Sequence, residues 1–353
     1  MTNTTVLISG AGVAGAALGH FLHRDGYDVT VVERAPGLRG SGYAVDFRGG
    51  AFDVLDELGI LEEIRSHDTA MRGTTLVDAD GAEIGRLPAE TFAGELEVAK
   101  PELTKILHRL TEPELTYVFD DSLTALTHHD NGVAVEFERG APRTFDLVVG
   151  ADGLFSKVRR LAFGPHEQAL RHLGMSGAGF TADNILGLDH SGVLQTGDGI
   201  AVYAFSAADA DRMSVSLSCA TDAPTLDRRP RTEQEQALRD AFAGAGWVVP
   251  ELLKAMSAAD DFYFSSSSQV HLDTWSTGRV VLVGDAGYCA APTAGMGTSQ
   301  ALIGARALAR ALAAADGDHT AAFTAYEAKL RPYVTENQVK GQEGAAAFGG
   351  RDQ

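Results

Sequence analysis

The stretch VLISGAGVAGAALGHFLHRDGYDVTVVER, residues 6–34, decides the fold. Its first residues are apolar and predict a buried parallel strand, which runs directly into the glycine motif GAGVAG at residues 10–15. A helix is expected over residues 14–24, Gly26 ends it, and residues 28–32 form a second strand. The chain therefore begins with one strand–turn–helix–strand unit, as in open, mostly parallel α/β sheets.

The glycines and the acidic residue of this unit predict a dinucleotide site. Gly10, Gly12 and Gly15 allow a tight turn, close approach of a pyrophosphate and close packing of helix on strand. The N-terminus of the helix, near Ala14, offers free N–H groups and a positive dipole end to phosphates. Glu33, at the tip of the second strand, suits the hydroxyl pair of a ribose and would repel a 2′-phosphate. A glycine-rich turn can serve packing alone. Here, however, a strand, the glycine motif, a helix, a second strand and an acidic residue follow one another in the order that a dinucleotide site requires.

Length and composition indicate a globular protein of two interleaved domains. The chain has 353 residues, of which 44% are hydrophobic and 22% charged. A formal net charge of −19 argues against nucleic acid and anionic membranes as partners. No transmembrane run or signal peptide is visible, and Cys219 and Cys289 lack metal-ligand spacing. We therefore expect a cytoplasmic protein without a metal, either monomeric or weakly dimeric.

The hydrophobic pattern predicts that a second domain interrupts the nucleotide-binding domain twice. A helix is expected over 51–66, a hairpin over 74–85, a buried strand over 144–150 and a long alanine-rich helix over 298–315. Alternating strands of an antiparallel sheet fill most of the region from about residue 163 to 268. The expected division is 1–72, 98–166 and 270–340 for the nucleotide-binding domain, 73–97 and 167–269 for the substrate-binding domain, and 341–353 for a flexible tail.

Two later strands, like the first, end in a loop that contains glycine, and each of these two loops also contains an acidic residue. One ends in Asp152-Gly153, followed by Ser156 and Arg159, and the other ends in Gly284-Asp285. Ligands of open parallel sheets lie beyond the carboxyl ends of the strands, so three such loops could line one cleft. Asp152 or Asp285 could instead cap a helix or form a turn. Three glycine-flanked acidic loops after three buried strands favour the cleft.

These three motifs, in this order, resemble those of the single-component class A flavoprotein monooxygenases. This family has the fold of para-hydroxybenzoate hydroxylase and includes the tetracycline-inactivating monooxygenases, and the resemblance spans nearly the whole chain. It implies an α/β fold in which an FAD-binding Rossmann-like (GR2-type) domain is interleaved with a mostly antiparallel β-sheet substrate domain. It also implies FAD as a tightly held, non-covalent cofactor, with NAD(P)H as a transient electron donor.

The resemblance assigns the glycine motif and Glu33 to the ADP half of FAD. Asp152-Gly153 would act around both FAD and the nicotinamide donor, and Asp285 would bind a ribityl or ribose hydroxyl. The loop 292–299 would lie beside the isoalloxazine. The implied cofactor contacts are Gly10, Gly12, Ala14, Gly15, Glu33, Arg34, Lys100, Asp152, Gly153, Gly284, Asp285, Pro292, Gly295, Met296, Gly297, Thr298 and Ser299.

The chemistry of the last loop agrees with this assignment. Reduced flavin carries negative charge, and a helix opening near Thr298 could present N–H donors and a positive dipole end to it. Gly295 and Gly297 would allow the backbone to approach the ring. The chain departs from the family pattern at several positions: Tyr288 replaces a common His, Met296 and Ser299 stand where Gln and Asn are frequent, and Lys100 stands for an Arg.

The implied reaction is a monooxygenation: NAD(P)H reduces FAD, O2 adds at the flavin C4a, and the resulting hydroperoxide oxygenates an aromatic or polyketide-like molecule of secondary metabolism. Candidates near substrate and flavin are Arg48, Asp46, Phe180, Tyr203, Phe205, Met213 and Pro292, although aromatic residues on strands usually belong to the core. No catalytic residue can be named, because the cofactor supplies the chemistry. Two alternatives stay open: an FAD-dependent dehydrogenase or oxidase of a natural-product intermediate, and a non-catalytic flavin- or ligand-binding protein.

Overall fold

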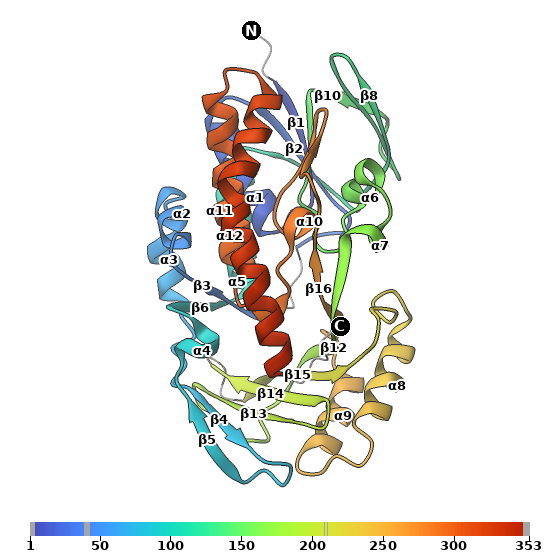
Figure 1. Ribbon diagram of the computed structural model, residues 1–353. Helices are drawn as coiled ribbons and strands as arrows, with labels where there is room; N and C mark the ends of the chain where they lie inside the picture. The colour runs from blue at the N-terminus through green and yellow to red at the C-terminus, as the bar shows by residue number, and fades with distance from the viewer. Residues whose placement is uncertain (1–3, 39–42, 208, 210, 349–353) are drawn as a thin grey trace.

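The computed structural model describes residues 4–38, 43–207, 209 and 211–348. Two large β-sheets lie one above the other, with long helices along one side of the upper sheet (Figure 1). Residues 39–42 and the last five residues of the expected tail lie outside the described residues.

The upper sheet is the open parallel sheet predicted from the N-terminal stretch. In spatial order its six strands are β17 (Ser276–Thr277), β18 (Val280–Leu282), β11 (Leu147–Gly150), β1 (Thr5–Ser9), β2 (Asp28–Glu33) and β7 (Thr116–Phe119). All neighbouring strands pair in parallel except β17, which is antiparallel to β18. The first strand is therefore central, as expected for an apolar run buried on both faces.

Helices and a small sheet cover the two faces of the upper sheet. One face carries the largest core cluster together with α1 (Val13–Arg24), α2 (Ala51–Glu57), α3 (Leu61–Ser66), α5 (Lys100–Thr111), α11 (Gly297–Ala314) and α12 (His319–Ala347). The other face packs on α6 (Lys157–Phe163) and on the three-stranded sheet of β8 (Leu123–His129), β9 (Gly132–Phe137) and β10 (Arg143–Phe145). Short elements complete the site region: β3 (Ala44–Phe47), α4 (Glu90–Ala93), β6 (Leu96–Ala99), α7 (His166–Ala169), α10 (Asp285–Tyr288) and the 3₁₀ turn η1 (Pro292–Ala294).

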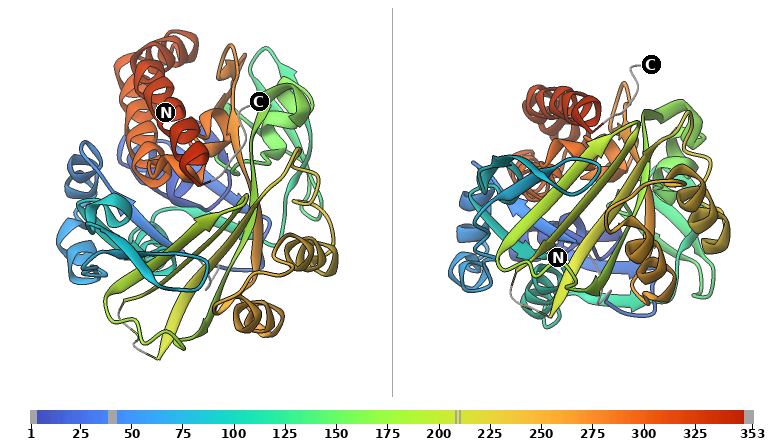
Figure 2. Two further views of the ribbon diagram at one scale, coloured as in Figure 1. Left: turned by 60° about the horizontal axis from the view of Figure 1, so that its bottom comes forward. Right: turned by 90° about the horizontal axis from the view of Figure 1, so that it is seen from below.

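The lower sheet is mostly antiparallel, as predicted. In spatial order its strands are β16 (Tyr263–Val270), β12 (Leu170–Asp183), β15 (Arg212–Ala220), β14 (Ile200–Ser206), β13 (Ser191–Gly197), β4 (Thr74–Val77) and β5 (Glu83–Leu87). The hairpin β4–β5 joins it through a parallel pairing with β13. Helices α8 (Arg231–Ala241) and α9 (Val249–Ala258) pack on one face, and the other faces the upper part of the molecule (Figure 2).

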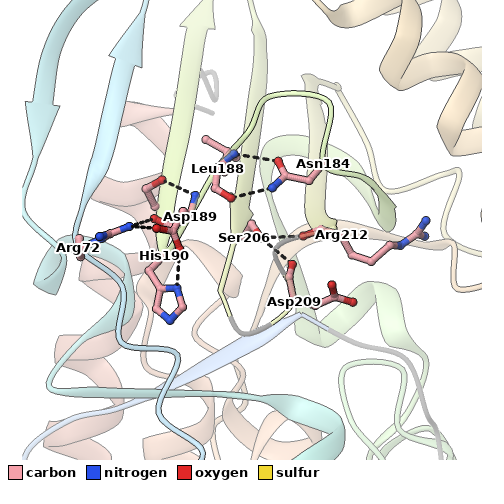
Figure 3. A network of polar contacts seen from close by, with 9 residues as sticks. Arg72, Asn184, Leu188, Asp189, His190, Ser206, Asp209 and Arg212 are labelled. Atoms are coloured by element: carbon pink, nitrogen blue, oxygen red, sulfur yellow. Dashed lines mark hydrogen bonds and ion pairs between the residues drawn. The ribbon is translucent and has the colours of Figure 1, made fainter.

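Polar contacts hold the turns at one end of the lower sheet (Figure 3). The Arg72 guanidinium, just before β4, donates to the carboxylate and the carbonyl of Asp189 in the β12–β13 connection. The Ser206 hydroxyl donates to the carbonyls of Asp209 and Arg212. The Arg72 contact ties the segment before β4 to the β12–β13 connection, and the Ser206 contacts close the turn between β14 and β15.

Two expected elements are each divided in the structure. The helix expected over residues 51–66 is two helices, because Gly59 lies between them with φ of +71°. The strand expected over residues 144–150 is two strands of different sheets. At the junction the Asp146 carboxylate accepts hydrogen bonds from the Thr5 backbone N–H and hydroxyl.

The expectation of a flexible tail from residue 341 is wrong for its described part, because α12 continues to Ala347. Gly341 and Gly344 lie directly against the backbone of the loop before α11. A Cβ at Gly341 would lie 2.0 Å from the Ala290 carbonyl oxygen, and one at Gly344 would lie 2.2 Å from that of Thr293. The end of α12 therefore supports the loop that leads into α11.

Replacing Gly341 by alanine will destabilise the protein. Glycine to alanine inside a helix ordinarily stabilises by up to about 1 kcal/mol, but here the added carbon needs space that the Ala290 carbonyl occupies. We expect a net loss of about 1–3 kcal/mol, measured by denaturant unfolding. Glu343→Ala, at an exposed position of the same helix, is the control. A Gly341→Ala variant as stable as wild type would contradict this packing.

Candidate functional site

The three predicted loops lie side by side at one edge of the upper sheet. Ser9 of β1 pairs with Gly150 of β11, which pairs with Leu282 of β18. The loops that follow these strands therefore leave the sheet together. No helix within the described residues is long and apolar enough to cross a membrane, and the described His, Cys, Asp and Glu residues form no cluster that could hold a metal ion.

In the first loop, Gly10 and Gly15 pack tightly against backbone atoms, whereas Gly12 faces open space. A Cβ at Gly10 would lie 2.5 Å from the Ala151 oxygen, and one at Gly15 would lie 2.0 Å from the Gly10 oxygen. A Cβ at Gly12, in contrast, would meet no atom within 4 Å. Packing within the protein therefore does not explain Gly12, which lies exposed at the N-cap of α1.

The carboxylate of Glu33 reaches this turn from the end of β2. It accepts hydrogen bonds from the backbone N–H groups of Ala11 (3.0 Å) and Ala35 (2.9 Å). Arg34 lies exposed beside it, and Ala14 is buried on α1, where a Cβ at Gly284 would lie 3.0 Å from the Ala14 Cβ. The first and third loops are therefore in contact.

Asp152 helps to cap helix α6, the alternative that the sequence left open, together with the N-cap residue Ser156, whose hydroxyl accepts the Arg159 N–H. Its carboxylate accepts the Ser156 hydroxyl and the backbone N–H groups of Lys157 (2.7 Å) and Val158 (3.2 Å) at the start of α6. The Ser9 hydroxyl, at the end of β1, also donates to it. Burial raises the pKa of Asp152, with the bond from Ser156 and these backbone donors acting in the opposite direction. Asp152 thus holds Gly153, with φ of +81°, at the cleft edge.

Arg159 connects the second loop to the third. Its guanidinium, 1% exposed, donates to the carbonyls of Leu154 and Ala286 and contacts the Nδ1 of His166. Burial lowers the pKa of Arg159 to about 10, which leaves it cationic at neutral pH. Because its bonds are to main-chain atoms, Arg159 fixes loop positions and is a positioning residue.

Asp285 follows Gly284 at the start of α10 and lines the cleft between the loops. Its side chain is accessible to solvent, yet burial raises its pKa, with the charge of Lys100 and a hydrogen bond with Cys289 lowering it. Lys100, at the first turn of α5, lies over the ring of Tyr43 at 4.8 Å from its centroid.

The last loop forms a strained turn before α11. Ala291 has φ of +76°, Pro292 opens η1, and Gly295 adopts the left-handed conformation with φ of +60°. Helix α11 begins at Gly297 after Met296, without a side-chain cap and without an acidic residue in its first turn. A Cβ at Gly297 would meet nothing within 4 Å. The N-terminus of α11, with Thr298, therefore presents free N–H groups and a positive dipole end beside open space.

Tyr288 lies in the core and not in the cleft. It is fully buried, its hydroxyl accepts a hydrogen bond from Tyr326 at 2.8 Å, and its ring lies 4.5 Å from that of Trp275. A Cβ at Gly304 would lie 2.1 Å from the Tyr288 hydroxyl. The departure from the family histidine therefore changes packing behind the third loop.

Asp46 and Arg48 lie next to the loop before α11. The Arg48 backbone N–H donates to the Ser299 hydroxyl at 3.0 Å, and its guanidinium Nε donates to Asp46. A Cβ at Gly295 would lie 3.8 Å from the Asp46 carboxylate. Residues about 250 positions apart in the chain thus meet at the predicted flavin end of the site.

The four candidates on the lower sheet divide between its two faces. Phe180 and Met213, 3% and 1% exposed, pack under α8 and α9, so their assignment to the substrate site is wrong. Tyr203 and Phe205 point to the opposite face, with ring centroids 5.5 Å apart, and Phe92 lies 5.0 Å from Tyr203. Alternation along a strand decides this division, because successive side chains point to opposite faces.

The sequence offered no signal for Glu97, which the structure places in the same region. It lies on β6 directly opposite Asp46 of β3. It is 7% exposed, and burial raises its pKa to about 7. Glu97 follows no glycine motif, and its partner is fifty-one residues away, so only the strand pairing reveals it.

Two cavities lie elsewhere in the structure. One of about 750 Å³ lies between the start of β12, Phe155, Arg228 and the end of α12. The other, of about 490 Å³, lies between Arg159, His271 and Arg331. Both cavities border these loops, through Phe155, Arg159 and Tyr288, but their linings include none of the motif glycines, Glu33, Asp152 or Asp285. We therefore place the cofactor from the geometry of the three loops.

The residues at the convergent loops fit FAD. Gly12 leaves space for a pyrophosphate at a helix N-terminus, Glu33 reaches that turn, and Asp285 is exposed in the third loop. The uncapped N-terminus of α11 suits the negative charge of a reduced flavin. Bound there, FAD would supply the redox chemistry, and these residues would bind and orient it.

Comparison with known proteins agrees with this fit. The family model described as "FAD binding domain" matches residues 3–338. A flavin-dependent monooxygenase of Legionella longbeachae is 35% identical over 96% of this chain and 88% of its own, and an uncharacterised protein of Mycobacterium tuberculosis is 44% identical over 95% and 91%. The crystal structure of the tetracycline destructase Tet(55) superimposes with a TM-score of 0.89 at 35% identity, covering 98% of this chain and 90% of that one.

The chain belongs to the FAD binding domain family. Within it, the protein is an FAD-dependent monooxygenase of the class A type, similar to the tetracycline destructases. This confirms the family, the fold class and the enzymatic nature that the three motifs predicted.

Proposed function

We propose that the protein uses NAD(P)H and O2 to oxygenate an aromatic or polyketide-like small molecule. NAD(P)H supplies two electrons to FAD, one oxygen atom of O2 enters the product, and the other leaves as water. The substrate lies on the face of the lower sheet that carries Tyr203 and Phe205. The tetracycline destructases among the similar structures, whose name gives a polyketide-like substrate, support this substrate class.

One structural observation carries the proposal. Asp46 lies beside Gly295 at the predicted flavin end, and Glu97, opposite Asp46, is close enough to Tyr203 for its charge to raise the pKa of that phenol, after burial. The predicted reactive end of FAD and the aromatic face are therefore joined through one pair of side chains. We assign the cofactor contacts to the three loops because they leave one edge of the upper sheet together. Cys219 and Cys289 are free and buried, which supports a cytoplasmic location.

The test is incorporation of labelled oxygen. FAD-loaded protein is supplied with NADPH or NADH, ¹⁸O2 and a panel of phenols together with tetracycline, and products are analysed by mass spectrometry. We expect one labelled atom per product and NAD(P)H oxidation that depends on the substrate. Oxidised product without label would contradict monooxygenation and favour a dehydrogenase or oxidase.

A further inference from the structure

Two carboxyl groups face each other between the predicted flavin end and the substrate face. Strands β3 and β6 form a two-stranded antiparallel sheet in which Asp46 pairs with Glu97. Their neighbours Val45, Phe47 and Val98 point the other way, into the large core cluster. The side chains of Asp46 and Glu97 therefore share the face that looks away from the core.

The surroundings of this pair hold fewer positive than negative charges. Arg48 donates its Nε to Asp46, while Asp68 adds a further negative charge near Glu97. Thr69 donates its hydroxyl to Glu97 at 2.7 Å. Tyr203 is the titratable group that approaches from the lower sheet. One guanidinium thus faces several acids, and like charges this close cannot all ionise at low cost.

The pair lies between the loop before α11 and the aromatic residues of the lower sheet. Asp46 lies next to Gly295, and Glu97 influences Tyr203, whose ring stacks on Phe205.

Burial raises the pKa of both acids. The cation of Arg48 donates to Asp46, whereas the neutral hydroxyl of Thr69 donates to Glu97, so the ionised form of Asp46 is the better stabilised of the two. We therefore take Glu97 as the member of the pair that exchanges a proton.

We propose that Glu97 is the general base that accepts the proton of a phenolic or enolic substrate hydroxyl, with Asp46 and Arg48 setting its charge state. The O–H bond of the substrate breaks, an O–H bond forms on the Glu97 carboxylate, and no electrons change hands in this step. The resulting phenolate or enolate is a better nucleophile towards an electrophilic oxygen. This role rests on the proposed function, because it requires an ionisable substrate at the site.

The electrostatics of the site agree with that role. The pKa of Glu97 is raised to about 7. Burial is the largest cause and the charges of Asp46 and Asp68 add to it, while the bond from Thr69 and the charge of Arg48 act in the opposite direction. A base is most effective when its pKa is near the working pH. The ionised form of Glu97 would dominate above neutrality, so the rate should rise with pH through this range.

The first test needs no substrate. FAD-loaded protein is titrated from about pH 5 to 9 while the visible spectrum of the flavin and the infrared band of protonated carboxyl groups are followed. We expect one transition near neutrality in the wild-type protein. Glu97→Gln should remove this transition. Glu95→Gln, a control at an exposed position two residues away, should retain it. The same transition in Glu97→Gln would overturn the inference. Should Glu97→Gln fail to fold, Asp46→Asn must still shift the transition to lower pH, and an unshifted transition would overturn the pairing.

The second test uses tetracycline and a simple phenol as probes in the ¹⁸O2 assay. We expect Glu97→Gln to lower kcat/KM by about 10²–10⁴-fold and to lose the acid limb of the pH profile, while FAD affinity stays near that of wild type. Glu97→Asp should restore part of the limb. Turnover by Glu97→Gln with an unchanged pH profile would overturn the inference. A wild-type protein that oxygenates no probe would instead contradict the proposed function. The titration would then decide whether Glu97 ionises near neutrality.

Discussion

Replacing Gly12 by valine will abolish tight FAD binding and leave the fold of the protein unchanged. Gly12 has an extended conformation, φ −75° and ψ −174°, that any residue can adopt, and a Cβ there would meet no protein atom. The space that valine fills is the space we assign to the pyrophosphate. We expect the dissociation constant of FAD to rise at least about 100-fold, a loss of about 3 kcal/mol.

The stability of the FAD-free protein separates this effect from misfolding. Unfolding of Gly12→Val should lie within about 0.5 kcal/mol of wild type, as for other exposed positions. Gly246→Val is the matched control for FAD binding. Gly246 lies in a loop of the lower domain, where a Cβ would make only an ordinary contact, at 3.6 Å from the Ala79 oxygen. Gly15→Ala should damage the fold itself, because its Cβ would lie 2.0 Å from the Gly10 oxygen. A Gly12→Val protein that binds FAD as wild type does would place the pyrophosphate elsewhere.

Replacing Glu97 by glutamine will stabilise the FAD-free protein at alkaline pH. The folded-state pKa of about 7 lies above the ordinary value of 4.5, so the folded protein binds this proton more tightly than the unfolded chain. The contribution of Glu97 to stability is fully present below about pH 4.5 and is lost as the pH rises through 7. Glutamine has no proton to lose.

We therefore expect the free energy of unfolding of Glu97→Gln to exceed that of wild type by up to about 3 kcal/mol above pH 7, with little difference near pH 4.5. Urea unfolding at a series of pH values measures this gap, with Glu95→Gln as control. A gap that does not change with pH would show that Glu97 ionises as an ordinary exposed glutamate.

The three motif loops could be predicted from the sequence because each is encoded locally. A buried strand, a glycine turn and an acid follow one another within a few residues, and parallel strands bring their carboxyl ends to one edge. The order of strands in space then places the loops together without further information. The same local evidence could not separate a cap from a ligand at Asp152, because both use a carboxylate at the start of a helix.

Two strands of the lower sheet, β12 and β16, could not be recognised from their composition. β12 contains Gly174, Gly177 and Gly179, and β16 contains the serine run 265–268, neither of which reads as a strand. The structure explains the glycines by close approach: a Cβ at Gly177 would lie 2.5 Å from the Leu217 oxygen, and Gly179 lies under the ring of Tyr263. Tertiary packing, and not propensity, makes these segments strands.

The rest of the site could not be predicted because the sequence does not show which face of the sheet each side chain occupies. Phe180, Tyr203 and Met213 have similar chemistry, and only the register of the strands shows which of them faces α8 and α9. Glu97 and Asp46 are fifty-one residues apart and meet only through the pairing of β3 and β6. A buried pair of this kind has no sequence signature.

A crystal structure of the FAD complex tests the account most directly. We predict the pyrophosphate at the Gly10–Gly15 turn, Asp285 on a ribityl or ribose hydroxyl, and the isoalloxazine between the N-terminus of α11 and the Asp46–Glu97 pair. Flavin density instead in the 750 Å³ cavity beside Phe155 and Arg228 would contradict it.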